Sequence, residues 1–245
     1  MDKKKRFWNW KKLSNEESGP MEPRELEIGG VIAEDGWFDD DVTPKVFKEE
    51  LMRGKGPVTI WINSPGGDCI AASCIYSALM DYPGEITVKV SGLAASAASV
   101  VAMAGDKVQM AATAMLMLHN PATSVYGDHN EMKQAIKLLD EVKESIINAY
   151  EIKTNLSRDE ISRLMENETW MNAKRAIQLG FADSLLEDKA VEDTAVDDAF
   201  SFSARLGEKE LLGRIAARYK EKEIEDVSMK GTRIAELEKR LELLK

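Results

Sequence analysis

The sequence predicts an α/β domain, and three observations carry this prediction. Short apolar segments alternate with helical patterns from about residue 26 to residue 187, which is typical of strands that alternate with helices. Residues 58–62 are almost continuously apolar, as in a strand buried on both faces of a sheet. Glycine, proline and asparagine stand between these segments, where turns are expected.

The individual elements follow from periodicity and from capping residues. We expect strands at residues 26–32, 58–62, 86–90, 107–110 and 114–118. We expect helices at residues 43–53, 69–81, 96–104, 128–150, 157–165 and 172–180. Capping boxes, in which a glutamate follows the capping residue by three positions, begin the long helix at Asp128 and the next helix at Ser157.

Three further segments flank this domain of residues 26–187. Residues 1–25 are expected to form a basic-aromatic N-terminal arm, because six lysine and arginine side chains stand against Asp2 among the first twelve residues. Such an arm is most often solvated and partly disordered. Residues 188–206 read as an acidic linker, and residues 207–245 as a helical tail whose last part has the leucine spacing of a weak coiled coil.

Composition excludes several function classes. The 245 residues carry a net charge of −10, which argues against a general nucleic-acid-binding protein. No apolar run approaches the roughly 18 residues of a membrane span. The only cysteines, Cys69 and Cys74, read as unpaired residues of a reducing cytoplasm. Two cysteines and two histidines at these spacings do not make a metal site, so we expect neither metal nor cofactor.

The candidate nucleophile is Ser96, in the segment Gly92-Leu93-Ala94-Ala95-Ser96-Ala97-Ala98-Ser99. This serine stands where an expected strand turns into a small-residue helix, and small neighbours allow a substrate backbone to approach. The unpaired amides of a helix start can stabilise a developing oxyanion. Ser99 is a rival nucleophile one helical turn further on, but a helix would turn it inward.

Serine catalysis also needs a base and oxyanion donors. The chain has two histidines. His119 ends an apolar strand and is the better base, whereas His129 lies in the first turn of the long helix and is expected to be exposed. The turn Ser64-Pro65-Gly66-Gly67 follows a buried strand, and its bare backbone can place an amide near a reacting carbonyl.

These segments resemble the proteolytic subunits of Clp proteases. Three motifs occur in the order and approximate spacing of that family: Asn63-Ser64-Pro65-Gly66-Gly67, Gly92-Leu93-Ala94-Ala95-Ser96 and Met117-Leu118-His119-Asn120-Pro121. The similarity continues through the long helix and Trp170-Met171-Asn172-Ala173 to Asp183, and it covers most of residues 26–187. It implies the fold shared by Clp proteases and crotonases, with repeated β-β-α units and a protruding handle helix.

The resemblance also implies roles for residues. Ser96 would be the nucleophile and His119 the general base, while Gly67 and Ala97 would donate backbone amides to the oxyanion. The family usually has aspartate as the third triad member, and Glu168 stands at the matching position. Asp183 is the alternative, although it resembles a structural acid after a helix end.

Partners follow from the same resemblance. The family forms stacked rings that act on unfolded or extended polypeptides. The Lys/Arg-rich aromatic start and the helical tail make the chain more similar to the head maturation proteases of tailed phages, which process scaffold and capsid proteins inside a procapsid. The alternatives are an ATPase-partnered housekeeping Clp subunit, a non-catalytic capsid-assembly protein of the same fold, and a crotonase-type acyl-CoA enzyme.

Overall fold

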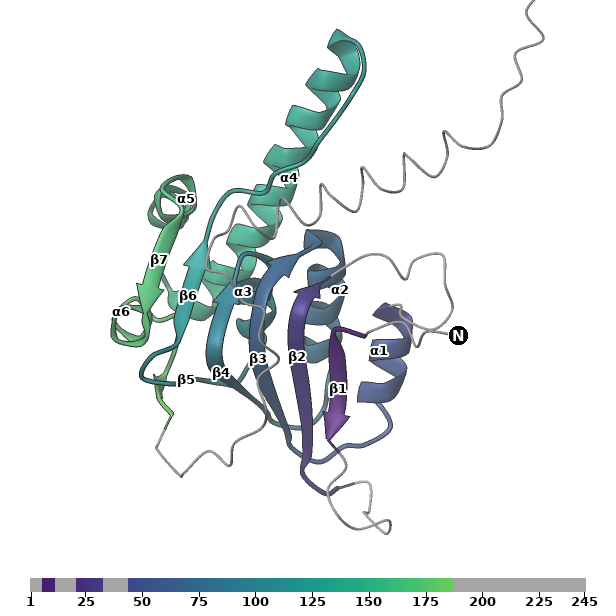
Figure 1. The fold of residues 1–245 in the computed structure, drawn as a ribbon, viewed down its shortest axis with the longest axis vertical. Coiled ribbons are helices and arrows are strands. Elements are labelled where there is room, and N and C mark those ends of the chain that lie inside the picture. The colour runs from purple at the N-terminus through teal and green to yellow at the C-terminus, as the bar shows by residue number, and fades with distance from the viewer. Residues whose placement is uncertain (1–5, 12–20, 33–43, 187–245) are drawn as a thin grey trace, which may run out of the picture. The chain divides into compact units, whose positions relative to one another are not determined.

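The computed structural model describes residues 6–11, 21–32 and 44–186 (Figure 1). These residues form a mixed α/β structure around one sheet, as the sequence predicts. The acidic linker, the helical tail and Thr43, the first residue of an expected helix, lie outside the described residues. Among the helices of the described ranges, none combines the length and the hydropathy that crossing a bilayer requires.

The described strands form an eight-stranded sheet. In chain order they are β1 (Trp8–Lys11), β2 (Arg24–Ile32), β3 (Val58–Gly67), β4 (Ile86–Ala95), β5 (Lys107–Met110), β6 (Met115–Leu118), β7 (Thr169–Asn172) and β8 (Ser184–Leu185). Strands β2, β3 and β4 run parallel at its centre. The two antiparallel pairs, β1 with β2 and β6 with β7, lie at its margins.

Strand β4 divides the sheet along its own length. Its first half, from Thr87 to Val90, pairs with β5, and β5 pairs in turn with β8. Its second half pairs instead with β6, from Leu93 to Ala95. The carboxyl end of β4 therefore lies beside a different neighbour from its start, and such a change of neighbours at the carboxyl ends of parallel strands is where ligands bind in open α/β sheets.

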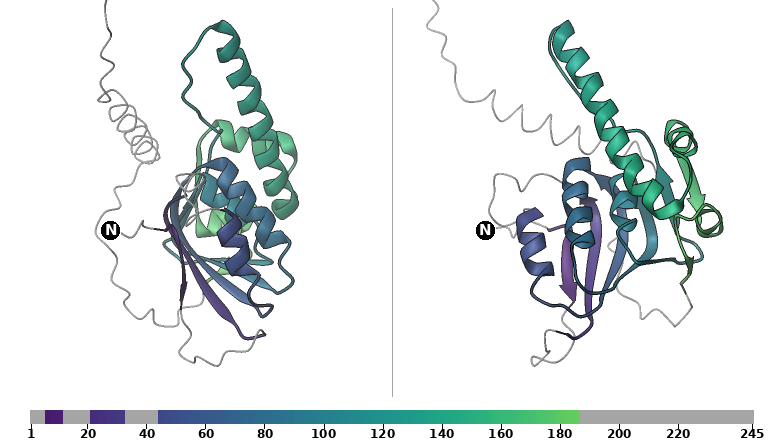
Figure 2. Two further views of the ribbon diagram at one scale, coloured as in Figure 1. Left: turned by 90° about the vertical axis from the view of Figure 1, so that its right-hand side faces the viewer. Right: turned by 180° about the vertical axis from the view of Figure 1, so that it is seen from behind.

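Six helices are described: α1 (Pro44–Leu51), α2 (Cys69–Met80), α3 (Ala97–Ala102), α4 (His129–Thr154), α5 (Arg158–Glu166) and α6 (Ala173–Gln178). Both predicted capping boxes are present, with Asp128 and Glu131 at the start of α4 and Ser157 and Glu160 at the start of α5. Asn172 caps α6, as expected. The first four helices lie on one side of the sheet (Figure 2).

Helix α4 is half inside and half outside the domain. Its C-terminal part is buried through Ile146, Ile147 and Tyr150, whereas its N-terminal part projects beyond the sheet (Figures 1 and 2). The apolar side chains of Met132, Ile136 and Leu138 on the projecting part are exposed. Among the described residues, the apolar side chains of this helix therefore pack against the domain only at its base.

The basic-aromatic segment differs from the solvated arm expected for residues 1–25. Trp8–Lys11 forms β1 and pairs antiparallel with β2. Trp8 is only 3% exposed, its ring packs edge-on against Phe47, and its Nε1 donates a hydrogen bond of 2.9 Å to Glu50. Burial of an indole outweighs the tendency of a charged terminus to remain in water. The sequence did not indicate this burial, because Trp8 stands among several lysine and arginine residues, which favour a solvated segment.

Candidate active site

Ser96 occupies the single residue between β4 and α3, and its backbone is strained. Its φ of 53° and ψ of −127° lie outside the regions that L-residues ordinarily adopt. Such a conformation costs about 1–3 kcal/mol and persists only where the surroundings impose it. Two backbone hydrogen bonds do so, from the Ser96 amide to the Met117 carbonyl and from the Ser99 amide to the Ser96 carbonyl, both 2.9 Å long.

His119 reaches Ser96 directly. It follows the last residue of β6, and the parallel register that pairs Ala95 with Met117 brings it beside the end of β4. Its Nε2 lies 2.7 Å from Ser96 Oγ. Nucleophile and base are thus in hydrogen-bond contact, as a general base requires. His129, the alternative base, is exposed at the first residue of α4.

Glu168 and His119 each lie one residue beyond the last partners of the β6–β7 pair. The last antiparallel partners of that pair are Leu118 and Thr169, so the next residues outward are His119 and Glu168. Glu168 has a positive φ of 44°, and its side chain is exposed and accepts a hydrogen bond of 3.3 Å from Trp170 Nε1. Register thus brings this carboxylate to the histidine's edge of the sheet.

Asp183, the alternative third member, is engaged elsewhere. Its Oδ2 accepts a hydrogen bond of 2.6 Å from the amide of Val108 and lies 2.9 Å from Lys153 Nζ. Its own amide donates to the Val108 carbonyl at 2.8 Å. These contacts tie β5 to the segment before β8 and to α4, which is the structural role that a carboxylate after a helix end was expected to have.

The sequence predicts a turn at Gly66 and Gly67, but β3 continues through both residues, paired with β2. This end of β3 lies directly against the nucleophile. Gly66 has a φ of +94°, and a Cβ atom there would lie 2.8 Å from Ser96 Cβ and 2.9 Å from the Ala97 amide nitrogen. A Cβ on Gly67, whose φ is +147°, would overlap the Ile32 carbonyl oxygen. Glycine is therefore required at both positions, and this end of β3 and the start of α3 touch, as the predicted oxyanion donors Gly67 and Ala97 need.

Ser64 organises this end of β3, a role that the sequence motif contains but did not reveal. Its side chain is fully buried, donates a hydrogen bond of 2.6 Å to the Gly30 carbonyl and accepts one of 3.1 Å from the Gly66 amide. The amide of Gly66 is thus engaged, which favours Gly67 as the donor on this strand. A small hydroxyl before a Pro-Gly-Gly sequence is the signal that identifies such a residue.

Ser99 and Cys69 are both held in unreactive states. Ser99 is fully buried and its Oγ donates a hydrogen bond of 2.6 Å to the Ser96 carbonyl. Cys69 and Cys74 are free thiols, and the pKa of Cys69 is raised to about 11 by its burial and by the Asp68 carboxylate. A thiol with so high a pKa is neutral at physiological pH and a poor nucleophile.

Comparisons with known proteins identify the family of this chain. Residues 27–189 match the family model described as Clp protease. The chain is 28% identical over 162 residues to the ATP-dependent Clp protease proteolytic subunit 1 of Chlamydia muridarum, covering 61% of this chain and 84% of that subunit. It is 27% identical over 156 residues to the ATP-dependent Clp protease proteolytic subunit of Porphyromonas gingivalis, covering 60% of this chain and 70% of that subunit.

A third relative, the ATP-dependent Clp protease proteolytic subunit 2 of Thermobifida fusca, is 25% identical over 154 residues, which cover 60% of this chain and 76% of that subunit. The matched region of the family model contains the candidate nucleophile, base, carboxylate and oxyanion donors. It spans the described domain from β2 to β8. The chain belongs to the Clp protease family.

Proposed function

We propose that this chain is a serine endopeptidase in which Ser96 is the nucleophile, His119 the general base and Glu168 the carboxylate that orients the imidazole. The observation that carries the proposal is the 2.7 Å contact between His119 Nε2 and Ser96 Oγ at a strained strand-to-helix turn. Strained backbone at a contact of this kind is characteristic of a nucleophile. Family membership supports a peptidase on independent grounds.

The reaction follows from these positions. His119 Nε2 takes the proton from Ser96 Oγ as the oxygen attacks the scissile carbonyl, and a tetrahedral intermediate forms. The imidazolium then returns the proton to the leaving amine, the C–N bond breaks and an acyl-enzyme remains. Water, deprotonated by the same imidazole, attacks the acyl carbon, and Ser96 leaves with a proton. Glu168 stabilises the imidazolium at each stage.

The oxyanion would be held by the amides of Gly67 and Ala97. Ala97 is the first residue of α3, so its amide has no acceptor within the helix. The Gly66 backbone lies against this amide because Gly66 has no side chain to separate them, and Gly67 follows it directly in the chain. A donor of this kind contributes roughly 2.7–4 kcal/mol to transition-state stabilisation, so loss of the close approach is expected to be severe.

The substrates are proposed to be unfolded or extended polypeptides, degraded or trimmed by a ring of subunits. The projecting half of α4 supports self-association, because it exposes Met132, Ile136 and Leu138 on a helix that no other described element covers. The curated relatives are named as proteolytic subunits of an ATP-dependent protease, which supports a housekeeping subunit with an ATPase partner.

We further propose the head maturation of a tailed phage as the biological setting. The support lies in the lysine- and tryptophan-rich N-terminal sequence, of which β1 joins the sheet, and in the expected helical tail. A maturation protease would cut co-expressed scaffold or capsid protein without ATP. A housekeeping subunit would degrade folded substrate only after addition of a Clp ATPase and ATP, so the two settings are separated by the energy requirement.

The test is hydrolysis of a fluorogenic peptide and of an unfolded protein by the wild type, Ser96→Ala and Ser99→Ala. Ser96-dependent cleavage of both substrates is the expected result. Cleavage that persists in Ser96→Ala would contradict the assignment. Intact-mass measurement of the purified wild type and Ser96→Ala adds a test of the maturation role, because tails that are intact in both, with no association with capsid protein, would count against it.

A further inference from the structure

Two buried hydroxyl groups hold the nucleophile turn from inside the domain. Ser99 Oγ lies 2.6 Å from the Ser96 carbonyl oxygen, and Tyr150 Oη lies 2.8 Å from Ser99 Oγ. Ser99 is 0% exposed and Tyr150 is 1% exposed. The chemistry described above uses neither group, and both are hydrogen-bonded, as buried hydroxyls generally are.

The direction of these hydrogen bonds is determined by chemistry. A carbonyl oxygen can only accept, so the single hydroxyl hydrogen of Ser99 points to Ser96. Tyr150 is therefore the donor in its contact with Ser99 Oγ. Burial raises the pKa of Tyr150 well above its ordinary value, so the phenol keeps this proton at physiological pH. The result is a fixed relay from Tyr150 to Ser99 to the Ser96 carbonyl.

The relay binds the carbonyl of a peptide group whose amide is a proposed oxyanion donor. The carbonyl of Ser96 and the amide of Ala97 belong to one planar, trans peptide unit, in which C=O and N–H point in opposite directions. Anchoring the Ser96 oxygen towards the core therefore aims the Ala97 N–H away from the core. On that side lies Gly66, whose Cβ position would be 2.9 Å from the Ala97 nitrogen.

We propose that Tyr150 and Ser99 are positioning residues that fix the Ser96–Ala97 peptide plane and thereby aim the Ala97 amide at the oxyanion. This inference rests on the proposed role of Ser96 as nucleophile. It assigns to the base of α4 a part in catalysis, because Tyr150 is the only relay member that lies on that helix.

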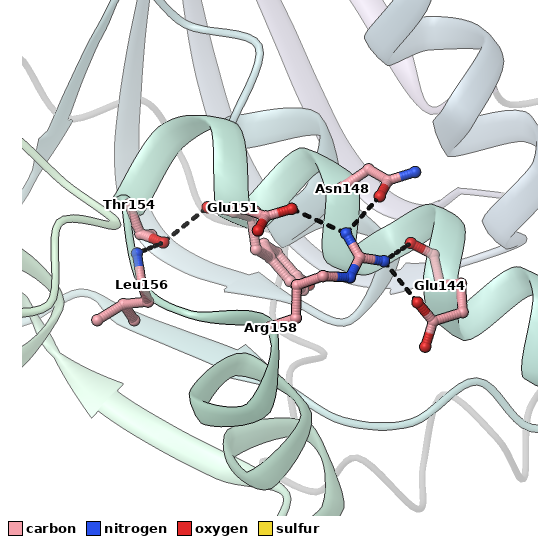
Figure 3. Close-up of polar contacts among 7 residues, drawn as sticks. Glu144, Asn148, Glu151, Thr154, Leu156 and Arg158 are labelled. Carbon is pink, nitrogen blue, oxygen red and sulfur yellow. Dashed lines mark hydrogen bonds and ion pairs between the residues drawn. The ribbon is translucent and has the colours of Figure 1, made fainter.

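The segment of α4 that carries Tyr150 is itself braced. Figure 3 shows the Arg158 guanidinium pointing to Glu144, Asn148 and Glu151 on α4. One turn after Tyr150, Thr154 Oγ1 donates a hydrogen bond of 2.7 Å to the Tyr150 carbonyl. The Tyr150 ring also packs edge-on against Phe181, with ring centroids 5.6 Å apart. A braced helix can present the phenol at a constant position.

The test compares Tyr150→Phe, Ser99→Ala and the double variant with a matched control. The control is Tyr82→Phe, because Tyr82 is also buried and its hydroxyl donates a hydrogen bond of 2.6 Å to a backbone carbonyl, that of Gly56, remote from Ser96. Each variant is measured for kcat, KM and thermal midpoint. An oxyanion donor is worth roughly 10²–10³ in kcat, so a mis-aimed donor is expected to cost a smaller factor of about ten.

We expect Tyr150→Phe to lower kcat about tenfold with KM unchanged, and Ser99→Ala to lower it at least as much. The double variant should equal Ser99→Ala alone, because Tyr150 acts through Ser99. Tyr82→Phe should lower the thermal midpoint by about as much as Tyr150→Phe does, but it should leave kcat unchanged. The proposal is overturned if Tyr150→Phe affects only stability, or if it lowers kcat by the same factor in the Ser99→Ala background.

A second readout does not depend on catalysis. Hydrogen exchange of the peptide that contains residues 96–99 should be faster in Tyr150→Phe than in the wild type and in Tyr82→Phe. Equal exchange in all three proteins would overturn the relay. A wild type that shows no Ser96-dependent hydrolysis would instead overturn the proposed function, so the two failures are distinguishable.

Discussion

The amide of Ser96 donates a hydrogen bond of 2.9 Å to the carbonyl of Met117, two residues before His119. This bond continues the β4–β6 pairing one residue beyond the end of β4. The distance between nucleophile and base is therefore set by the register of two paired strands and does not depend on a loop. Sites built on such rigid elements are held more precisely than sites on loops.

His119 is expected to be indispensable. Replacement by alanine removes the only described group in contact with Ser96 Oγ that can accept its proton, and loss of a triad base lowers kcat by roughly 10³-fold or more. His129→Ala is the matched control, because His129 is exposed at the start of α4. Peptide hydrolysis that falls equally in both variants would contradict the assignment of the base.

Substitutions of Glu168 and Asp183 are expected to affect different properties, catalysis for Glu168 and stability for Asp183. Glu168→Gln should lower kcat by roughly a hundredfold or more with little change in the thermal midpoint, because an amide cannot stabilise the imidazolium. Glu168→Asp should retain part of the activity. Asp183→Asn should lower the thermal midpoint and leave kcat intact, since Asp183 holds the Val108 amide and Lys153. The opposite pattern would transfer the catalytic role to Asp183.

Trp8 is expected to stabilise the domain. Trp8→Ala removes a side chain that is 3% exposed, and such a truncation costs about 3–5 kcal/mol in the free energy of unfolding. Asn9→Ala on the exposed face of the same strand should cost little. Denaturant unfolding of both variants measures the difference. Equal stability of the two would show that β1 does not contribute to the folded domain.

The contact between α4 and α5 is expected to weaken in acid. The pKa of Glu166 is lowered by its hydrogen bond to Lys143 and by a second from Ser162. A carboxylate whose pKa is lower in the folded state stabilises at pH values above the unfolded pKa, and the effect disappears as pH falls through the folded pKa.

Glu166→Gln should therefore lower the thermal midpoint at pH 7 by more than in acid below the lowered folded pKa of Glu166, where both proteins carry a neutral side chain at this position. The comparison uses scans of both proteins at each pH. Glu49→Gln is a suitable control, because Glu49 is also exposed and lies 4.0 Å from Lys45. A difference between wild type and Glu166→Gln that is the same at both pH values would contradict this account.

Local signals in the sequence predicted most of the fold. The structure confirms the two helix starts predicted from the capping boxes at Asp128 and Ser157. It also confirms the strand predicted from the apolar run before Ser64. The short strands β7 and β8 were not predicted. Their four and two residues are too few for a period to be recognised, and partners distant in the chain determine them.

The site was predictable where motif and local geometry coincide, as at Ser96, Gly66 and Gly67. Its supporting residues were not. The sequence presents Ser99 only as a rival nucleophile and gives no signal for Tyr150, and their contact joins positions 51 residues apart. Such a contact depends on how α4 packs beneath α3, which no local pattern in the sequence encodes.

The most direct test of the catalytic account is covalent labelling by a fluorophosphonate, followed by peptide mapping. Wild type, Ser96→Ala and Ser99→Ala are each treated and digested, and the modified residue is located by mass spectrometry. We expect one adduct on Ser96 in the wild type, the same adduct formed more slowly in Ser99→Ala, and none in Ser96→Ala. Labelling of any other residue, or equal labelling of the wild type and Ser96→Ala, would contradict Ser96 as the nucleophile.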